Sequence, residues 1–237
     1  MPKLAHPPLQ QFRLRFDFPS IDDPSIGSLS EICKELSGKK YLESIRISLI
    51  SATTPKRTLQ FMPIRFVSKS EDHELLIFND AIVFTYQKYS TWLEILPPIL
   101  ETFSYLVMQL NIKKLKDIRL DYIDVFDKFS KKNFQIQTYF NISLNIPPDF
   151  SITFDDFIIG MNLSTDNPNY KSIIRLRGVQ PSTDDFYNIQ LETHFSITEE
   201  IIIDMDQIKE LLDLAHESIS KNFKTMLSEN TKKIIGM

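Results

Sequence analysis

Pairs of neighbouring aspartates are the residues in this sequence whose types and spacing come closest to a catalytic site. Carboxylate oxygens are the ligands that Mg²⁺ prefers, so two acids side by side could hold a cation for phosphoester hydrolysis. Adjacent acids in loops also mark turns and helix starts, which need no cation. We keep metal-dependent hydrolysis as an alternative hypothesis for four acidic candidates: Asp155, Asp156, Asp184 and Asp185.

Other catalytic signatures are missing from the sequence. The chain has only five glycines, and they are too far apart to build a phosphate-binding loop, which needs closely spaced residues without a Cβ. The four histidines are scattered and form no metal-ligand spacing, and no serine lies in a Gly-x-Ser-x-Gly turn. We therefore expect no cofactor, no metal and no enzymatic activity.

The densest aromatic cluster surrounds the single tryptophan, Trp92, with Tyr86 and Tyr89 close to it in the sequence. One interpretation is a core joint between a hairpin and the helix that follows it. The other is an interface anchor, because aromatic rings provide a large contact area at a small cost in conformational entropy. These three residues are our candidates for an interface.

Composition narrows the class of protein. Hydrophobic residues are 42% and charged residues 24% of the 237, values typical of a globular chain. A net charge of −4 disfavours a general nucleic-acid binder, although a local basic patch stays open as an alternative. No apolar run is long enough to span a bilayer, and the first nine residues lack a secretory signal. With a single cysteine, Cys33, we expect a protein of the reducing cytoplasm, with no membrane association.

Alternation of apolar and polar residues predicts many short strands. In residues 11–18, four apolar side chains share one face: Phe12, Leu14, Phe16 and Phe18. The same reasoning predicts strands at 42–50, 57–67, 73–78, 81–87, 117–126, 151–163, 171–178, 186–195 and 199–204. Between two of them, Asn79 and Asp80 predict a two-residue hairpin turn.

Apolar residues at helical spacing predict two long amphipathic helices. For the first, Thr91 and Glu94 could cap a first turn, and we expect a bend at Pro97-Pro98, with Pro98 restarting the helix over 98–111. The second covers 207–227, with Asp206 as its N-cap. Residues 133–150 indicate a strand or short turn that runs into a connection.

These elements predict an α+β fold with a mainly antiparallel sheet in two halves, each ending in a long amphipathic helix that packs on the sheet. We divide the chain into an N-terminal half, 1–130, and a C-terminal half, 131–237. The shared order of strand, strand and long helix suggests a pseudo-repeat within one globular unit.

Several of these segments together resemble a known family. The relevant segments are Pro7-Pro8-Leu9 before Leu14-Arg15-Phe16, Tyr86-x-x-Tyr89-x-x-Trp92-Leu93, Ile118 to Asp124, and a final helix with Ala215-His216-x-x-Ile219-x-x-x-Phe223. The chain is similar to a sporadically distributed prokaryotic family of uncharacterised proteins of comparable length. Asp121 and Asp124 stand where that family usually has Arg and Asn, so no role of that arginine is carried over. Patchy distribution implies mobile-element, toxin–antitoxin or phage-defence gene cassettes.

Our leading hypothesis is a non-enzymatic binding or assembly subunit, part of a prokaryotic defence or toxin–antitoxin complex. Its partner would be another protein, in a homo- or hetero-oligomer. The first alternative is a small-molecule or lipid pocket between a curved sheet and the C-terminal helix. The second is the aspartate-dependent phosphoester hydrolase described above.

Overall fold

The computed structural model describes residues 9–21, 31–32, 34–36, 44–47, 64–68, 72–87, 91–132, 134–144, 157–179 and 185–237. The chain divides into two units, which we call the N-unit and the C-unit. The N-unit comprises the described residues within 12–119 and 197–211, and the C-unit those within 1–11, 120–196 and 212–237. The division of the sequence after residue 130 and the pseudo-repeat stay predictions.

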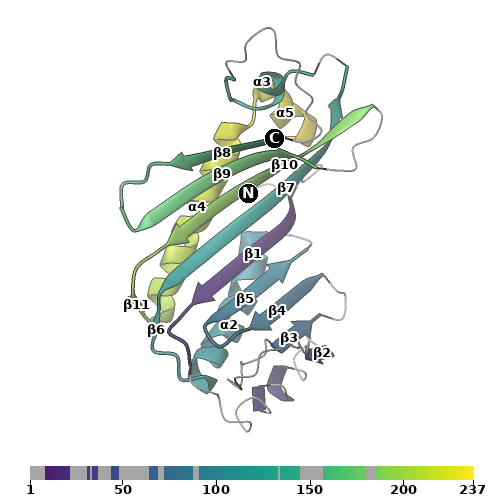
Figure 1. The fold of residues 1–237 in the computed structure, drawn as a ribbon. Coiled ribbons are helices and arrows are strands. Elements are labelled where there is room, and N and C mark those ends of the chain that lie inside the picture. The colour runs from purple at the N-terminus through teal and green to yellow at the C-terminus, as the bar shows by residue number, and fades with distance from the viewer. Residues whose placement is uncertain are drawn as a thin grey trace, which may run out of the picture. The chain divides into compact units, whose positions relative to one another are not determined.

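The N-unit contains an antiparallel sheet with the strand order β2-β3-β4-β5-β1 (Figure 1). Its strands are β1 (Leu9–Asp17), β2 (Ser44–Ile47), β3 (Ile64–Val67), β4 (His73–Ile77) and β5 (Ala81–Tyr86). A two-residue turn at Asn79 and Asp80 joins β4 to β5, as predicted, and the amide of Phe78 donates to the carbonyl of Ala81 at 2.7 Å. A second, two-stranded pair consists of β6 (Lys114–Leu115) and β11 (Ile201–Ile202).

Helix α2 (Trp92–Gln109) packs on this sheet through the apolar face of β1. Phe12, Leu14 and Phe16 of that strand and Phe18, which follows its end, are all buried, as predicted. The ring of Phe16 stacks on that of Phe103 in α2 with 3.9 Å between centroids. The period of two on the strand and the apolar stripe on the helix therefore meet in one core.

The expected restart of the helix at Pro98 is wrong, because α2 begins at Trp92 and includes both prolines. The missing N–H groups of Pro97 and Pro98 would have bonded to the carbonyls of Leu93 and Glu94 in the first turn. Leu93 is 82% exposed, so this turn lies at the surface, where water can replace the lost bonds.

In the C-unit the strand order is β7-β10-β9-β8 (Figure 1). Its strands are β7 (Asp117–Ser130), β8 (Ile158–Leu163), β9 (Tyr170–Gly178) and β10 (Phe186–Ile197). Residues from 134 to 144 contain a single helical turn, α3 (Ile136–Tyr139), where we expected a strand or turn. The rest of the segment predicted as 133–150 lies outside the described residues.

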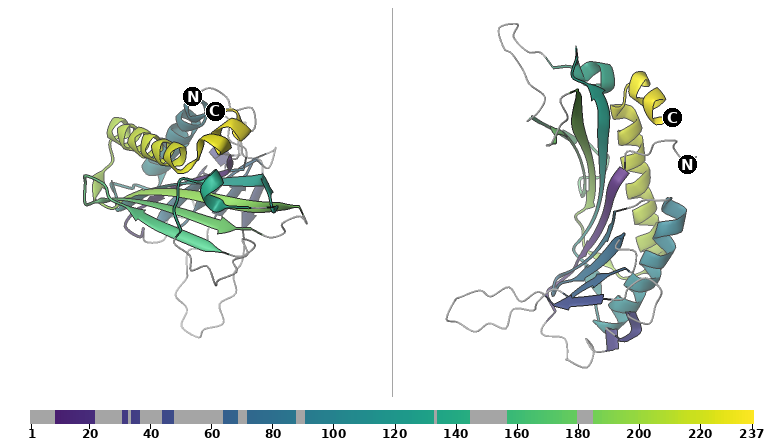
Figure 2. Two further views of the ribbon diagram at one scale, coloured as in Figure 1. Left: turned by 90° about the horizontal axis from the view of Figure 1, so that it is seen from above. Right: turned by 90° about the vertical axis from the view of Figure 1, so that its right-hand side faces the viewer.

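Helices α4 (Met205–Met226) and α5 (Glu229–Ile235) lie on one side of the C-unit sheet (Figure 2). The stripe predicted for 207–227 is buried at Ile208, Leu212, Ala215, Ile219 and Met226. The predicted N-cap, Asp206, is wrong by two residues. The carboxylate of Asp204 instead accepts hydrogen bonds from the backbone amides of Asp206 and Gln207, at 2.9 and 3.0 Å.

The fold is therefore α+β, mainly antiparallel, with a long amphipathic helix packed on the sheet of each unit. None of the described helices is long and apolar enough to cross a membrane.

Candidate functional site

Three of the four predicted acidic candidates, Asp155, Asp156 and Asp184, lie outside the described residues, as do Tyr89 and Cys33. Asp185 is exposed next to the first residue of β10, and its carbonyl accepts a hydrogen bond from the amide of Lys131 at 2.8 Å. Among the described residues, no group of three or more His, Cys, Asp or Glu side chains could hold a metal ion. The metal-dependent hydrolase stays a prediction.

The aromatic candidates lie where α2 begins. Trp92 is only 8% exposed, and its ring meets that of Phe12 edge to face with 6.0 Å between centroids. Tyr86, at the end of β5, contacts Phe12 in the same way at 5.9 Å and stacks on His73 at 5.0 Å. These contacts account for both side chains as parts of the N-unit core. Their role in an interface stays a prediction.

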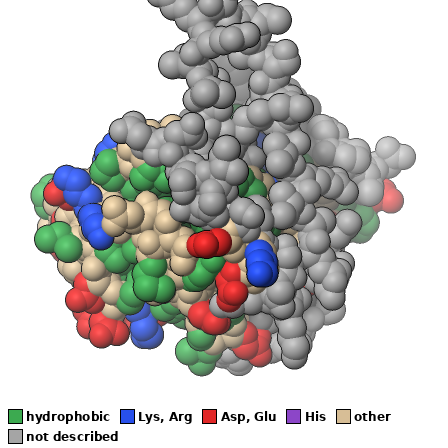
Figure 3. All heavy atoms as spheres, turned by 90° about the horizontal axis from the view of Figure 1, so that it is seen from below, with side chains coloured by type: hydrophobic (Ala, Val, Ile, Leu, Met, Phe, Trp, Pro, Cys, Tyr) green, Lys and Arg blue, Asp and Glu red, His purple; other side chains and the backbone are tan. Residues whose placement is uncertain are grey.

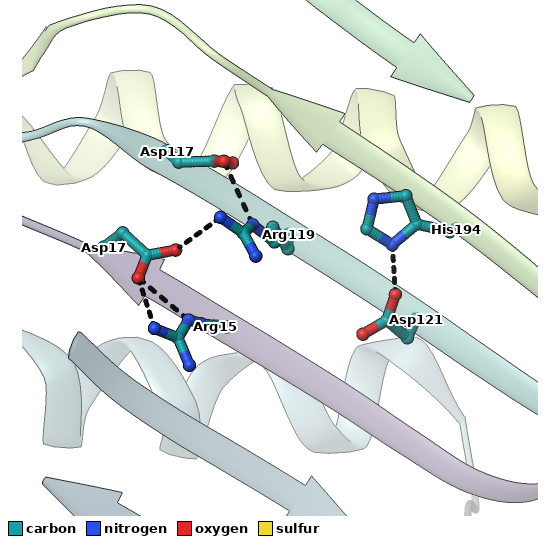
Figure 4. Close-up of polar contacts among 6 residues, drawn as sticks. All are labelled: Arg15, Asp17, Asp117, Arg119, Asp121 and His194. Carbon is teal, nitrogen blue, oxygen red and sulfur yellow. Dashed lines mark hydrogen bonds and ion pairs between the residues drawn. The ribbon is translucent and has the colours of Figure 1, made fainter. Parts of the chain in front are cut away.

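A chain of alternating charges crosses the N-unit from β1 to β7 (Figure 4). Arg15 pairs with Asp17 at 2.7 Å, and this hydrogen bond raises the pKa of the arginine above its ordinary value. Arg119 reaches Asp17 at 3.4 Å and Asp117 at 3.0 Å. The side chains of Asp17 and Asp117 are only 16% and 13% exposed, so Arg119 compensates two largely buried carboxylates.

Replacement of Arg119 by glutamine is expected to lower the free energy of unfolding by about 1 kcal/mol, because Asp17 and Asp117 lose a shared cation. Urea unfolding measures this loss. Lys114→Gln is the matched control, since Lys114 pairs with Glu200 where both side chains are exposed, at 44% and 62%. An equal or larger loss in the control would show that the Arg119 chain has no special role.

A buried polar cluster lies between the C-unit sheet and α4. The hydroxyl of Tyr122 and Nδ1 of His216 form a hydrogen bond at 2.6 Å. Burial is the main reason why the pKa of His216 is lowered to about 4, so the ring is neutral at pH 7 and can accept this bond. Asp124, two residues further along β7, is 4% exposed, and burial raises its pKa to about 8. This carboxyl is therefore mostly protonated at pH 7.

The opposite face of the C-unit sheet carries charged side chains, and no described helix lies on it (Figure 2). His194 on β10 contacts Asp121 on β7 through Nδ1 (Figure 4). Beside them, Arg175 and Arg177 on β9 both approach Glu192 on β10, at 3.7 and 3.1 Å. We call this side of β7, β8, β9 and β10 the outer face.

The outer face becomes more exposed toward β8, which ends the strand order. Ile158 is 73% exposed, and Gly160 and Asn162 are exposed on the same side of the strand. Each pairs with a residue of β9 whose side chain also lies on the outer face: Arg177, Arg175 and Ile173. Apolar and cationic side chains therefore alternate at an exposed margin, as in surfaces that bind other proteins.

The sequence pattern indicates the burial of Asp124 but not the importance of the residues on the outer face. The alternation that places Ile118, Leu120 and Tyr122 on one side of β7 also places Asp124 there. Gly160, Arg175 and Arg177 could not be singled out, because their importance depends on which strands pair.

The described surface seen in Figure 3 mixes acidic, basic and apolar side chains, and its described basic side chains form no continuous area. This distribution gives no support to a nucleic-acid interface on that side.

No protein-family model matches the chain, and no curated protein does. Among solved structures, Methanococcus jannaschii TBP aligns with 92% of this chain and 99% of its own, at 12% identity and a TM-score of 0.29. A likeness at this level carries no argument about fold or function.

Proposed function

We propose that the chain is a non-enzymatic binding subunit that holds a partner protein on the outer face of the C-unit sheet. The observation that carries this proposal is the exposed margin of that face, where Ile158 is 73% exposed beside Arg175 and Arg177. Isolated surface isoleucines are common, but here the exposed side chain lies at the end of a sheet and next to cations.

The described polar groups also support binding over catalysis. Asp17 and Asp117 are engaged by Arg15 and Arg119, and His194 is engaged by Asp121. The carboxylate of Asp72 is engaged as well, since it accepts a hydrogen bond from the hydroxyl of Ser68 at 2.9 Å and contacts Nδ1 of His73 at 2.7 Å. Location in the cytoplasm and membership of a defence or toxin–antitoxin complex stay predictions, the first from Cys33 and the second from the family resemblance.

The test compares two matched isoleucine variants. Ile158→Lys places a charge on the outer face, and Ile202→Lys places the same charge on β11 of the N-unit, where Ile202 is 74% exposed. Tagged protein is recovered from its native cells, with quantitative mass spectrometry of what accompanies it and light scattering of the complex.

Wild type and Ile202→Lys are expected to retain the same partner, and Ile158→Lys to lose it roughly tenfold, because a buried lysine cannot be solvated at a closed interface. Equal recovery with all three proteins, or a monomer without any partner, would contradict the proposal.

A further inference from the structure

We propose that the outer edge of β8 binds an extended peptide segment of the partner as an added antiparallel strand, and that this segment carries a carboxylate directed at Arg175. The inference rests on the proposed function and names the chemistry of the partner. It is carried by three independent features of the C-unit, namely the direction of the backbone groups of β8, the glycine in the middle of the strand, and the charges beside it.

The first feature is the hydrogen-bonding pattern of β8. The amide of Gly178 donates to the carbonyl of Phe157 at 3.1 Å, and the register continues as Ile158 with Arg177 and Ile159 with Leu176. In an antiparallel pair, hydrogen-bonded and non-hydrogen-bonded residue pairs alternate along the ladder. Residues 159, 161 and 163 therefore bond to β9, whereas the N–H and C=O groups of Ile158, Gly160 and Asn162 point to the outer edge.

No described strand pairs with that edge. The edge also lacks the usual protection, since β8 reads Ile-Ile-Gly-Met-Asn-Leu and contains neither a charged residue nor a proline. Three residues with outward donors and acceptors form a template of the kind that binds a peptide by strand addition.

The second feature is Gly160. A Cβ placed on this residue would meet no atom within 4 Å, and its φ is not in the left-handed region. Neither packing within the chain nor backbone conformation therefore requires a glycine here. Glycine in a strand also marks places where another backbone or ligand approaches closely, and this explanation fits an outward-facing edge position.

The third feature is an excess of positive charge on β9. Arg175 lies opposite Gly160 in the register of the two strands. Its side chain is 55% exposed and lies 3.7 Å from Glu192. The same glutamate is closer to Arg177, at 3.1 Å, and accepts a hydrogen bond from Gln190 at 2.8 Å. Two arginines thus share one carboxylate, and no described carboxylate pairs with Lys171 on the same strand.

These features together favour an acidic side chain on the bound peptide, at the residue opposite Gly160. A residue opposite Gly160 on an added strand would lie roughly 10 Å from the Cα of Arg175, two strand spacings away. Because Gly160 has no side chain, nothing on β8 separates the two, and a glutamate or aspartate could meet the guanidinium above it. A second copy of β8 cannot supply this group, since the strand has no acidic residue.

The probes are three short synthetic peptides of alternating valine and threonine with lysines at both ends. The first has a central glutamate, the second a central glutamine, and the third is the glutamate peptide with backbone N-methyl groups on alternate residues. Fluorescence anisotropy measures binding to the full chain. The glutamate peptide is expected to bind roughly tenfold more tightly than the glutamine peptide, with a difference that shrinks as salt is added. The N-methylated peptide is expected not to bind, since it cannot donate to the edge.

Protein variants test the same geometry from the other side. Gly160→Pro removes an outward N–H without removing a bond to β9, and Gly160→Ala is its control, since it keeps the N–H and adds a methyl group into open space. Proline is expected to weaken the glutamate peptide at least roughly tenfold. Alanine is expected to weaken it less, because its methyl group narrows the path to Arg175 but leaves the N–H in place. Arg175→Gln is expected to abolish the preference for glutamate over glutamine, and Lys114→Gln to leave it unchanged.

Several results would overturn the inference. One is no binding of the glutamate peptide to wild type. A second is equal binding of the N-methylated and unmethylated glutamate peptides to wild type, a comparison that does not depend on how the variants fold. A third is unchanged binding of the glutamate peptide to Gly160→Pro. A dimer of the chain that Gly160→Pro dissociates would assign the edge to a second copy. If Ile158→Lys loses the cellular partner but Gly160→Pro retains it, the proposed function stands and this inference fails.

Discussion

Replacement of Asp124 by asparagine is expected to raise the free energy of unfolding at pH 8 by on the order of 5 kcal/mol, and to leave it nearly unchanged at pH 4. Asp124 is 4% exposed on the apolar face of β7, and burial raises its pKa from 3.8 to about 8. Asparagine has nearly the same shape as the protonated acid, so the variant imitates the neutral form at every pH.

The direction in which the free energy of unfolding changes with pH follows from the protons that the folded and unfolded chains bind. Between pH 4 and pH 8 the unfolded chain ionises Asp124, whereas the folded chain keeps the proton. The free energy of unfolding of the wild type therefore falls as pH rises through this range, and the asparagine variant lacks this fall.

His216 acts with the opposite sign. Burial lowers its pKa from 6.5 to about 4, so its contribution to stability is present above pH 6.5 and is lost as pH falls toward 4. The two effects oppose each other between pH 4 and pH 6.5. The contribution of Asp124 is therefore read most clearly between pH 6.5 and pH 8.

Urea unfolding at several pH values provides the measurement. Asp127→Asn is the control on the same strand, because Asp127 is exposed, and its effect is expected to stay within about 0.5 kcal/mol at every pH. A wild type whose stability is flat from pH 6.5 to pH 8, or an Asp124→Asn variant that follows the wild type, would show that Asp124 is not buried as described.

Phe16→Ala is expected to lower the free energy of unfolding by about 3–5 kcal/mol, since it removes a buried ring and leaves a cavity. Phe16 is 0% exposed, stacks on Phe103 at 3.9 Å and meets Phe84 edge to face at 6.3 Å. A loss of this size is a large fraction of the stability of a typical domain. Circular dichroism with urea measures the loss.

Phe186→Ala is the matched control for that substitution. Phe186 is also a phenylalanine of a strand, the first residue of β10, but it is 40% exposed. Its substitution is therefore expected to lower the free energy of unfolding by about 1 kcal/mol or less. Similar losses for both variants would contradict the core that joins β1 to α2.

The sequence predicts what depends on local periodicity. The alternation in residues 11–18 and the stripes over 98–111 and 207–227 identify β1, α2 and α4, because one buried face imposes a period of two on a strand and 3.6 on a helix. The hairpin at Asn79 and Asp80 follows from turn chemistry in the same way.

What the sequence does not predict depends on contacts between distant segments. The pairing of Arg119 with Asp17 requires β7 to meet β1 residues within the N-unit, and nothing local to either residue indicates it. Likewise, β8 is an edge strand because β9 lies between it and β10, and no described strand pairs with the other side of β8. The N-cap prediction was wrong because Asp204 and Asp206 both carry a carboxylate that can cap a helix, and it is Asp204 that caps α4.

The most direct test of a template edge on β8 is amide hydrogen exchange of the uncomplexed protein, followed residue by residue by NMR. The amides of residues 159, 161 and 163 are expected to exchange slowly because they bond to β9, while those of Ile158, Gly160 and Asn162 exchange fast and become protected when the glutamate peptide is added. Slow exchange at all six positions without any peptide would mean that this edge is already paired, and the account would fail.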